Sequence, residues 1–249
     1  MLAIITGSGF TSLDGLHEPT TDIVETPYGQ AALTSGRWQG GPSVVFVPRH
    51  GPDHGIAPHA INYRANIWAI HEAGASGIVA TAVSGGIAPG LEPGTFVVID
   101  DFIDFTSGRQ ATFFDEPGNL RHTDVSEPYD PALRALIESA ARSVGAPLIV
   151  GGTYCTTNGP RFETRAEIEM MRRLGGDLVG MTGCPEVVLA AELAVPYASI
   201  GVISNRAAGL AERELSVPEI MDVLAGTREP LERIIDAVIG QLPGSENLA

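Results

Sequence analysis

The stretch Gly77-Ile-Val-Ala-Thr-Ala-Val-Ser-Gly-Gly86 is a run of apolar and small residues that ends in a serine and two glycines. Its apolarity is continuous rather than alternating, which is typical of a strand buried on both faces. Small residues at the end of a strand let a flat ligand approach the backbone closely, although close packing alone also explains them. The stretch therefore predicts a central strand, over residues 77–82, with a candidate binding edge at its end.

Apolar runs of the same kind recur along the chain and alternate with helical patterns. We expect further strands at residues 2–6, 44–48, 95–99, 148–157, 178–181 and 198–204. We expect helices at residues 60–73, 131–144, 164–174, 185–193 and 217–239, the last kinked or broken near Pro230. Capping boxes mark two helix starts, Thr164 with Glu167 and Ser216 with Glu219. This alternation of strands and helices predicts an α/β fold.

The composition indicates one compact globular domain spanning residues 1–249. Of these residues, 44% are hydrophobic and 18% are charged, and no linker, repeat or charge block divides the chain. The net charge of −15 repels polyanions, so we expect neither nucleic acid nor an anionic membrane as a partner. All basic residues are arginines, which excludes enzymes that depend on a Schiff-base lysine or a phosphate-loop lysine.

Two features of the sequence favour a cytoplasmic protein. Cys155 and Cys184 are too few to form a disulfide framework in a chain of this size. Neither a signal segment nor an apolar run of membrane-spanning length is visible.

Candidate anion-binding groups follow two of the predicted strands. Gly7-Ser8-Gly9 forms a turn that can present N–H groups and a hydroxyl to an anion, or it can simply require glycines for its backbone angles. It lacks the third glycine of a dinucleotide fingerprint. Arg49 and His50 come directly after the strand at 44–48, where open α/β sheets bind ligands. Arg49 could also pair with an acid, and His50 could be a structural imidazole; the spacing of His50 and His54 does not fit a helical zinc site.

Later segments add further candidate ligand contacts. Thr182 lies between a strand and a helix start, where N–H groups attract anions, and Met181 beside it can be a ligand contact or a core residue. Glu163 and Asn205 could together read donors and acceptors on the edge of a heterocycle. Each of the last two could instead only cap or solvate a turn.

Taken together, these segments resemble the trimeric purine nucleoside phosphorylase / methylthioadenosine phosphorylase family. The segments that carry the resemblance are Gly7-Ser8-Gly9, Arg49-His50-Gly51, Asn62-Tyr63-Arg64-Ala65-Asn66, Gly159-Pro160-Arg161-Phe162-Glu163 and Met181-Thr182 followed by Pro185-Glu186. The resemblance runs from near residue 2 to about residue 240 and implies an α/β fold with a mixed central sheet. It also implies a homotrimer, or a dimer of trimers, with no metal or organic cofactor. The implied reaction is attack of inorganic phosphate, as co-substrate, on C1′ of a nucleoside, which yields a free purine and a ribose 1-phosphate.

The resemblance also implies roles for individual residues. Phosphate would lie among Ser8, Arg49, His50, Thr182 and the backbone near Val83, in a cradle that stabilises the charge developing during bond cleavage. Met181 would pack on the ribose, and His122 would reach into the sugar pocket of a neighbouring subunit. The remaining substrate contacts would come from Ala82, Val83, Glu163, Asn205, Ala207 and Val217. Arg49, His50 and Asn205 would be the catalytic residues.

The base-binding positions favour 6-oxopurines over adenine. Methylthioadenosine phosphorylases of the family usually have a small hydroxyl residue where Glu163 stands and an aspartate where Asn205 stands. Glu163 can accept from N1–H of a 6-oxopurine, and Asn205 can accept from N7–H and donate to O6. Glu163 could otherwise serve only to stabilise a helix N-terminus.

The position of Val217 indicates the 5′ substituent. Val217 aligns with a small apolar residue that methylthioadenosine phosphorylases use near the 5′ position, although it could also be a core residue. The combination of features suggests inosine, guanosine and 5′-methylthioinosine as substrates, with S-methyl-5′-thioadenosine cleavage as the alternative. A hydrolase or a non-catalytic nucleoside sensor would not need the anion cradle.

Overall fold

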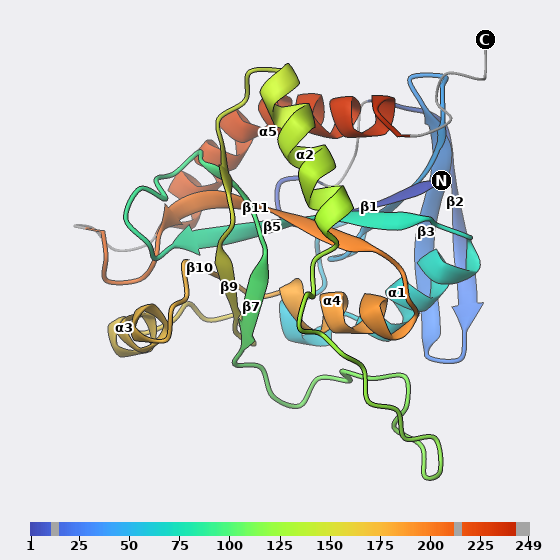
Figure 1. The fold of residues 1–249 in the computed structure, drawn as a ribbon, viewed down its shortest axis with the longest axis horizontal. Helices are drawn as coiled ribbons and strands as arrows, with labels where there is room; N and C mark the ends of the chain where they lie inside the picture. Colours follow the sequence, from blue (N-terminus) through green and yellow to red (C-terminus); the bar gives the residue numbers. More distant parts are fainter. Residues whose placement is uncertain (11–14, 212–215, 243–249) are drawn as a thin grey trace.

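The computed structural model describes residues 1–10, 15–211 and 216–242 (Figure 1). A mixed sheet of eleven strands runs through the molecule in the order β2-β3-β4-β1-β5-β10-β9-β7, and β11, β6 and β8 form a second branch from β5. The strands are β1 (Leu2–Thr6), β2 (Leu16–Thr26), β3 (Gly29–Trp38), β4 (Ser43–Pro48), β5 (Gly77–Gly86), β6 (Phe96–Val98), β7 (Asp101–Asp104), β8 (Leu148–Val150), β9 (Thr153–Thr156), β10 (Leu178–Gly180) and β11 (Tyr197–Arg206).

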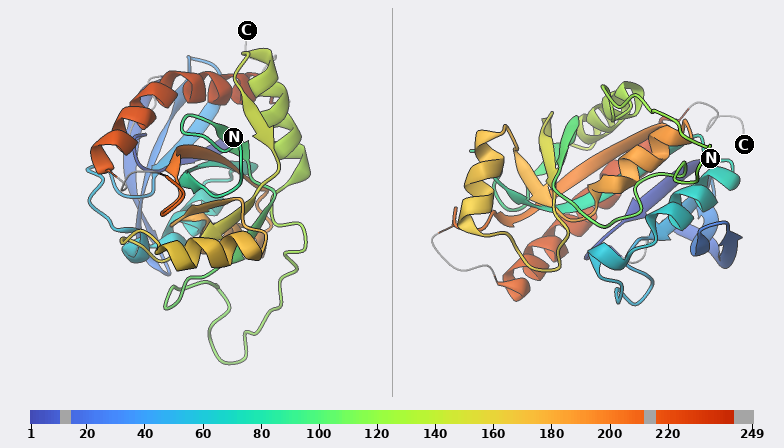
Figure 2. Two further views of the ribbon diagram at one scale, coloured as in Figure 1. Left: turned by 90° about the vertical axis from the view of Figure 1, so that its left-hand side faces the viewer. Right: turned by 90° about the horizontal axis from the view of Figure 1, so that it is seen from below.

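Helices cover both faces of this sheet, which confirms the expected α/β class (Figure 1, Figure 2). Helices α1 (Tyr63–Glu72) and α4 (Gly183–Glu192) lie on one face. Helices α2 (Pro131–Ser143) and α5 (Val217–Gly240) lie on the other. Helix α3 (Arg165–Arg173) packs against the β9–β10 end of the sheet, and a 3-10 turn, η1 (Pro58–Ala60), precedes α1.

The continuous apolar strands are buried on both faces, as their sequence predicts. In β1, Leu2 and Ile4 belong to the cluster under α2 and α5, whereas Ala3 and Ile5 belong to the cluster under α1 and α4. Successive side chains of a strand point to opposite faces, so a strand between two helical layers has no polar side. The same argument holds for β5, in which Ile78 and Val79 belong to different clusters.

Strand β5 is the point at which the sheet divides. One edge pairs with β11 along nearly its whole length, from Ile78 to Gly86. The other edge pairs with β1 at its start and with the antiparallel β10 at its end. The residues after β1, β4, β5 and β11 meet at one edge of the sheet, because these four strands are parallel.

Several elements differ from the sequence expectations. Residues 148–157 form two strands, β8 and β9, because Gly151 adopts a φ of +87° between them. The pattern also missed β2, β3 and β7; β2 is an edge strand whose side chains are mostly exposed and therefore show no apolar periodicity.

The helix starts and ends are also partly different. The capping box of Thr164 and Glu167 is confirmed, but Ser216 makes no side-chain cap at the start of α5. Pro230 lies inside α5, which continues to Gly240 without a break and curves around the molecule (Figure 2). No described helix is long and apolar enough to cross a membrane.

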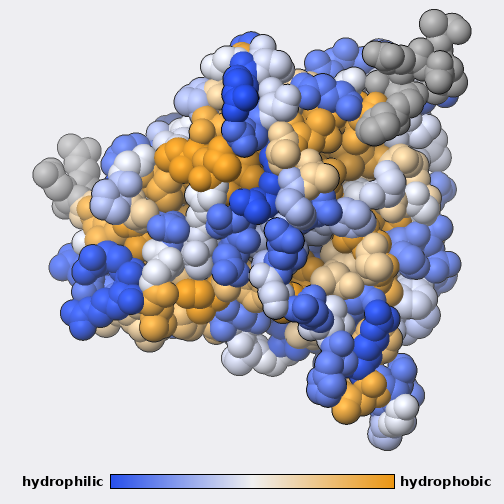
Figure 3. Space-filling model, viewed as in Figure 1, coloured by the Kyte–Doolittle hydropathy of each residue, from blue (hydrophilic) through white to orange (hydrophobic). Residues whose placement is uncertain are grey.

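A long segment, residues 105–130, leaves the body of the molecule between β7 and α2; we call it the arm. Its two ends are anchored, since Phe113 and Tyr129 are buried. Figure 1 shows the middle of the arm projecting from the molecule, and Leu120 of the arm is 77% exposed. Figure 3 shows a hydrophobic spot on this otherwise hydrophilic projection.

Two glycines provide a matched test of the packing at the end of β5. A Cβ at Gly86 would lie 2.2 Å from the backbone oxygen of Leu91, whereas a Cβ at Gly226 in α5 would meet nothing within 4 Å. We expect Gly86→Ala to destabilise the protein by about 2 kcal/mol or more, and Gly226→Ala to stabilise it by about 0.5–1 kcal/mol. Urea midpoints measured on both variants check this, and equal midpoints would contradict the packing argument.

Candidate active site

A cavity of about 460 Å³ opens at the edge of the sheet where the four parallel strands end. It is lined by residues that follow β1, β4 and β10, by the ends of β5 and β11, by residues 54–58 before α1, and by the first turn of α5. This location agrees with the general rule that open α/β sheets bind ligands beyond the carboxyl ends of their strands.

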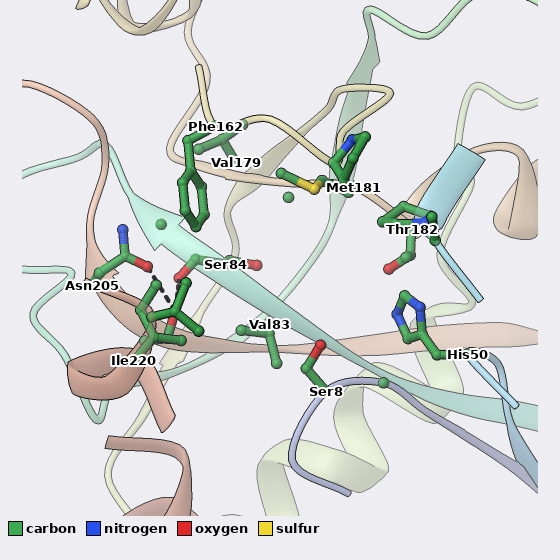
Figure 4. A pocket seen from close by; sticks show the side chains of 18 of the residues that line it. Ser8, His50, Val83, Ser84, Phe162, Val179, Met181, Thr182, Asn205 and Ile220 are labelled. Carbon is green, nitrogen blue, oxygen red and sulfur yellow. Dashed lines mark hydrogen bonds between the residues drawn. The ribbon is translucent and has the colours of Figure 1, made fainter. Parts of the chain in front are cut away.

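Most of the residues singled out in the sequence line this one cavity. They come from segments that are far apart in the chain: Ser8, Arg49, His50, Val83, Glu163, Met181, Thr182, Asn205, Ala207 and Val217. Figure 4 shows His50 and Thr182 at one end of the view and Phe162 and Asn205 at the other, with Ser8, Met181 and Val83 between them. The cavity thus has a hydroxyl and imidazole end and an amide and aromatic end.

Two predicted residues do not line the cavity. Ala82 is buried in the core cluster under α1 and α4, because alternation along β5 turns its neighbour Val83 toward the cavity instead. His122 is exposed on the arm and outside the cavity of its own chain. Its predicted role in a neighbouring subunit stays a prediction.

Arg49 both lines the cavity and forms a buried ion pair. Its Nε and Nη2 donate to the two carboxylate oxygens of Glu186 at 2.9 and 2.7 Å, and its Nη1 donates to the carbonyl oxygen of Thr81 at 2.6 Å. Both side chains of the pair are at most 2% exposed. A guanidinium has five N–H donors, so two remain for a ligand. Burial opposes the charge, but the attraction of Glu186 outweighs it and raises the pKa of Arg49.

Gly7 makes room for this guanidinium. A Cβ at Gly7 would lie 3.0 Å from Nη1 of Arg49. A side chain here would need the arginine to move by a few tenths of an ångström, so the close approach favours glycine. Its neighbour Ser8 shares a hydrogen bond of 3.1 Å with Nε2 of His54, a cavity residue that the sequence interpretation left without a role.

His50 enters the cavity as a neutral ring. Its Nδ1 lies 2.8 Å from the carbonyl oxygen of Ile56. A carbonyl only accepts, so Nδ1 carries the proton and Nε2 is left as an acceptor. Burial, helped by the nearby Arg49 and His54, lowers the pKa of His50 to about 4 against the opposing effect of the Ile56 bond.

The groups at the other end of the cavity are held in fixed orientations. The Oγ of Ser204 donates to Oδ1 of Asn205 at 2.7 Å, and Nδ2 of Asn205 donates to the carbonyl oxygen of Arg206 at 2.8 Å. These bonds leave one N–H and one lone pair of the amide for a ligand. Thr157 donates to Glu163 at 2.7 Å and fixes one of its carboxylate oxygens.

The structure adds several residues that the sequence interpretation missed. In the sequence, Met221 belongs to the apolar stripe that predicts the core face of α5, but it is 46% exposed and lines the cavity together with Ile220. An apolar helical stripe has the same spacing in the sequence whether its residues pack in the core or line a cavity. The periodicity therefore could not distinguish Met221 from a core residue. The other additions are Ser84, Phe162 and Ser204. Among the described residues, no three His, Cys, Asp or Glu side chains gather closely enough to hold a metal ion.

The buried neutral His50 predicts an acid-sensitive stability. In the unfolded chain the ring takes up a proton near pH 6.5, but in the folded chain only near pH 4. Acid therefore favours the unfolded state between these values. We expect the urea midpoint to fall from pH 7 to pH 4.5 less steeply in His50→Gln than in the wild type. His17→Gln, which removes an exposed histidine of β2, is the control and should keep the wild-type slope. Parallel curves for the wild type and His50→Gln would contradict the assignment.

Comparison with known proteins places the chain in a family. Residues 1–240 match the model of the phosphorylase superfamily. The chain is 43% identical to the 6-oxopurine nucleoside phosphorylase of Pyrococcus furiosus, over 97% of this chain and 93% of that protein. It is also 43% identical to a probable S-methyl-5′-thioinosine phosphorylase of Methanosarcina acetivorans, over 99% of this chain and 92% of that protein.

A solved structure agrees with this placement. The methylthioadenosine phosphorylase of Schistosoma mansoni in complex with adenine superposes with a TM-score of 0.90 at 32% identity, covering 96% of this chain and 90% of that one. The chain therefore belongs to the phosphorylase superfamily, in the family of purine nucleoside and methylthioadenosine phosphorylases that its motifs resemble.

Proposed function

We propose that this protein cleaves 6-oxopurine nucleosides with inorganic phosphate, releasing the free purine and a ribose 1-phosphate. The observation that carries the proposal is that one cavity has hydroxyl and imidazole groups at one end and a fixed amide at the other, and is also lined by the fixed carboxylate of Glu163. The relatives named 6-oxopurine nucleoside phosphorylase and S-methyl-5′-thioinosine phosphorylase support it. The alternative is an S-methyl-5′-thioadenosine phosphorylase, which the name of the structural neighbour favours.

Phosphate would bind among Ser8, Arg49, His50, Thr182 and the backbone at Val83. The two free N–H groups of Arg49 and the hydroxyls of Ser8 and Thr182 donate to its oxygens. Because Nε2 of the neutral His50 only accepts, it would take a hydrogen bond from a protonated phosphate oxygen. No covalent nucleophile is required. The fixed donors hold the phosphate anion beside C1′, and its negative charge stabilises the positive charge that develops on the sugar as the glycosidic bond breaks.

The purine would lie at the end formed by Phe162, Glu163 and Asn205. The free lone pair and free N–H of the Asn205 amide match N7–H and O6 of a leaving 6-oxopurine. Asn205 would thereby stabilise the base as it departs with a proton on N7. The second oxygen of Glu163 is available for N1–H, since Thr157 engages only the first.

The wall for the 5′ group is apolar. Val217, Ile220 and Met221, from the start of α5, line the cavity without offering a hydroxyl or imidazole. An apolar wall accommodates a methylthio group better than a hydroxyl that it leaves unpaired. We therefore place 5′-methylthioinosine among the substrates, beside inosine and guanosine.

We further propose that the protein works as a homotrimer in the cytoplasm, with phosphate as co-substrate and no cofactor. The exposed position of His122 on the projecting arm supports a role in a neighbouring subunit. Contacts between arms and neighbouring cavities would complete each sugar pocket.

The reaction is tested with purified protein and inosine, 5′-methylthioinosine and 5′-methylthioadenosine, each with and without phosphate. We expect release of hypoxanthine only when phosphate is present, and no release of adenine. The ratio of kcat/KM for methylthioinosine to that for inosine should exceed one, because the 5′ wall is apolar. Release of adenine would favour the alternative, and release of base without phosphate would replace the phosphorylase by a hydrolase.

The base-reading role of Asn205 predicts a change of specificity. Asn205→Asp should lower kcat/KM for inosine at least about tenfold and raise activity toward adenine nucleosides, because a protonated aspartate can donate to N7 and accept from the amino group. Asn205→Ala is the matched control and should lose activity toward both bases. Loss of all activity in Asn205→Asp, with no gain for adenine nucleosides, would count against this assignment.

A further inference from the structure

Arg109 is a single side chain that bonds the backbone of two loops carrying cavity residues. It lies at the start of the arm and does not itself line the main cavity. Its Nη2 donates to the carbonyl oxygen of Met181 at 2.7 Å and to those of Thr157 and Asn158 at 3.2 Å each. Its Nη1 donates to the carbonyl oxygen of Cys184.

The first of these loops carries both Met181 and Thr182. The bonds to Met181 and Cys184 clamp the loop on either side of Thr182, in a stretch that is not regular helix, since Cys184 has extended backbone angles. Without helical hydrogen bonds of its own, such a stretch depends on side chains to satisfy its carbonyl groups. Arg109 supplies those donors.

The second loop leads to the base-binding end of the cavity. Arg109 bonds the carbonyl oxygens of Thr157 and Asn158, and the hydroxyl of the same Thr157 holds Glu163. Arg109 therefore reaches Glu163 through one intermediate residue.

A third cavity wall is reached through Tyr63. Nη1 of Arg109 lies 3.3 Å from the Tyr63 hydroxyl, and the guanidinium lies over the Tyr63 ring, 5.2 Å from its centroid. The Tyr63 hydroxyl in turn donates to the carbonyl oxygen of Pro58, which lines the cavity, at 2.9 Å. Burial raises the pKa of Tyr63, so this hydroxyl keeps its proton and can donate.

The partners of Arg109, which is partly buried, differ in kind from those of the fully buried Arg49. Arg49 is neutralised by a carboxylate, whereas Arg109 has no carboxylate partner among the residues that the structure describes. Its hydrogen-bond partners are four carbonyl oxygens and one hydroxyl, from separate segments of the chain. A planar fork with several fixed N–H groups can serve such a set at once, but an ammonium group cannot.

We propose that Arg109 is a positioning residue that sets the walls of the nucleoside half of the cavity, and that it links them to the arm. The inference rests on the proposed function, because it assigns the loops bearing Met181 and Glu163 to nucleoside binding. Phosphate binding depends less on Arg109, since three of the four side chains proposed to hold phosphate, Ser8, Arg49 and His50, come from strand ends that Arg109 does not contact, and only Thr182 lies on a loop that it holds. A displacement of about 1 Å in groups that orient a substrate can lower the rate about a hundredfold.

The test compares steady-state constants for inosine and for phosphate in Arg109→Lys, Arg109→Gln and Arg109→Ala. We expect KM for inosine to rise at least about tenfold and kcat/KM to fall about a hundredfold in all three, with KM for phosphate changed less than about threefold. Arg109→Lys keeps the charge and loses the fork, so it should resemble Arg109→Gln. In Arg109→Ala, guanidinium at about 50 mM, far below unfolding concentrations, should restore activity, and methylammonium should not.

Arg64→Ala is the matched control. Arg64 anchors the same arm, donating to the carbonyl oxygen of Thr112 and pairing with Asp115 at 2.7 Å, but these partners lie in the arm and not in the cavity walls. It separates loss of arm anchoring from loss of the wall contacts, and we expect a smaller rise in KM for inosine than in Arg109→Ala.

The possible contrary results separate the two hypotheses. If wild type phosphorolyses inosine and the Arg109 variants match Arg64→Ala, the positioning role is wrong and the proposed function stands. Retained activity in Arg109→Lys alone would show that charge, not the fork, matters, and would also overturn the inference. If the wild type shows no phosphorolysis, the proposed function fails. The affinity for hypoxanthine, measured by calorimetry on the wild type and Arg109→Lys, then decides whether Arg109 shapes the cavity.

Discussion

The ion pair between Arg49 and Glu186 is the interaction on which the site depends. It joins the end of β4 to the first turns of α4, two segments more than a hundred residues apart, and the hydroxyl of Tyr197 in β11 also donates to Glu186 at 3.0 Å. Removing one partner of a buried pair costs about 3–5 kcal/mol, because the other charge is left unpaired in the interior. The pair therefore fixes an arginine with two spare donors at the cavity.

A second constraint comes from the way the sheet divides around β5. Two branches diverge from one strand, so the loops after β1, β4, β5 and β11 surround a hollow at one edge. Residues beside this hollow must be small where backbones approach, as Gly86 shows against Leu91. Helices on both faces exclude water from the strands and leave that edge as the place for a ligand cavity.

Little positive charge at the site is left without a compensating negative charge. Glu186 compensates Arg49, and His50 is held neutral by burial. Anion binding would then rely on directed N–H and O–H donors, as suits a site that must release its product. Arg109 donates to neutral carbonyl oxygens of the loop that carries Thr182, and in our proposal it sets the shape of that loop.

The sequence by itself determined the local features: the doubly buried strands, the five helices, the capping box at Thr164 and the residue types of the site. These follow from periodicity, end chemistry and hydrogen-bonding capacity, which are properties of neighbouring residues. Only the tertiary structure decided that Glu186 pairs with Arg49, that Val83 rather than Ala82 faces the cavity, that Met221 leaves the core and that Arg109 joins three walls. Each of these depends on which segments meet in space, and contacts between distant segments leave no period in the sequence. The exposed edge strand β2 was missed for the same reason, since only its pairing with β3 makes it a strand.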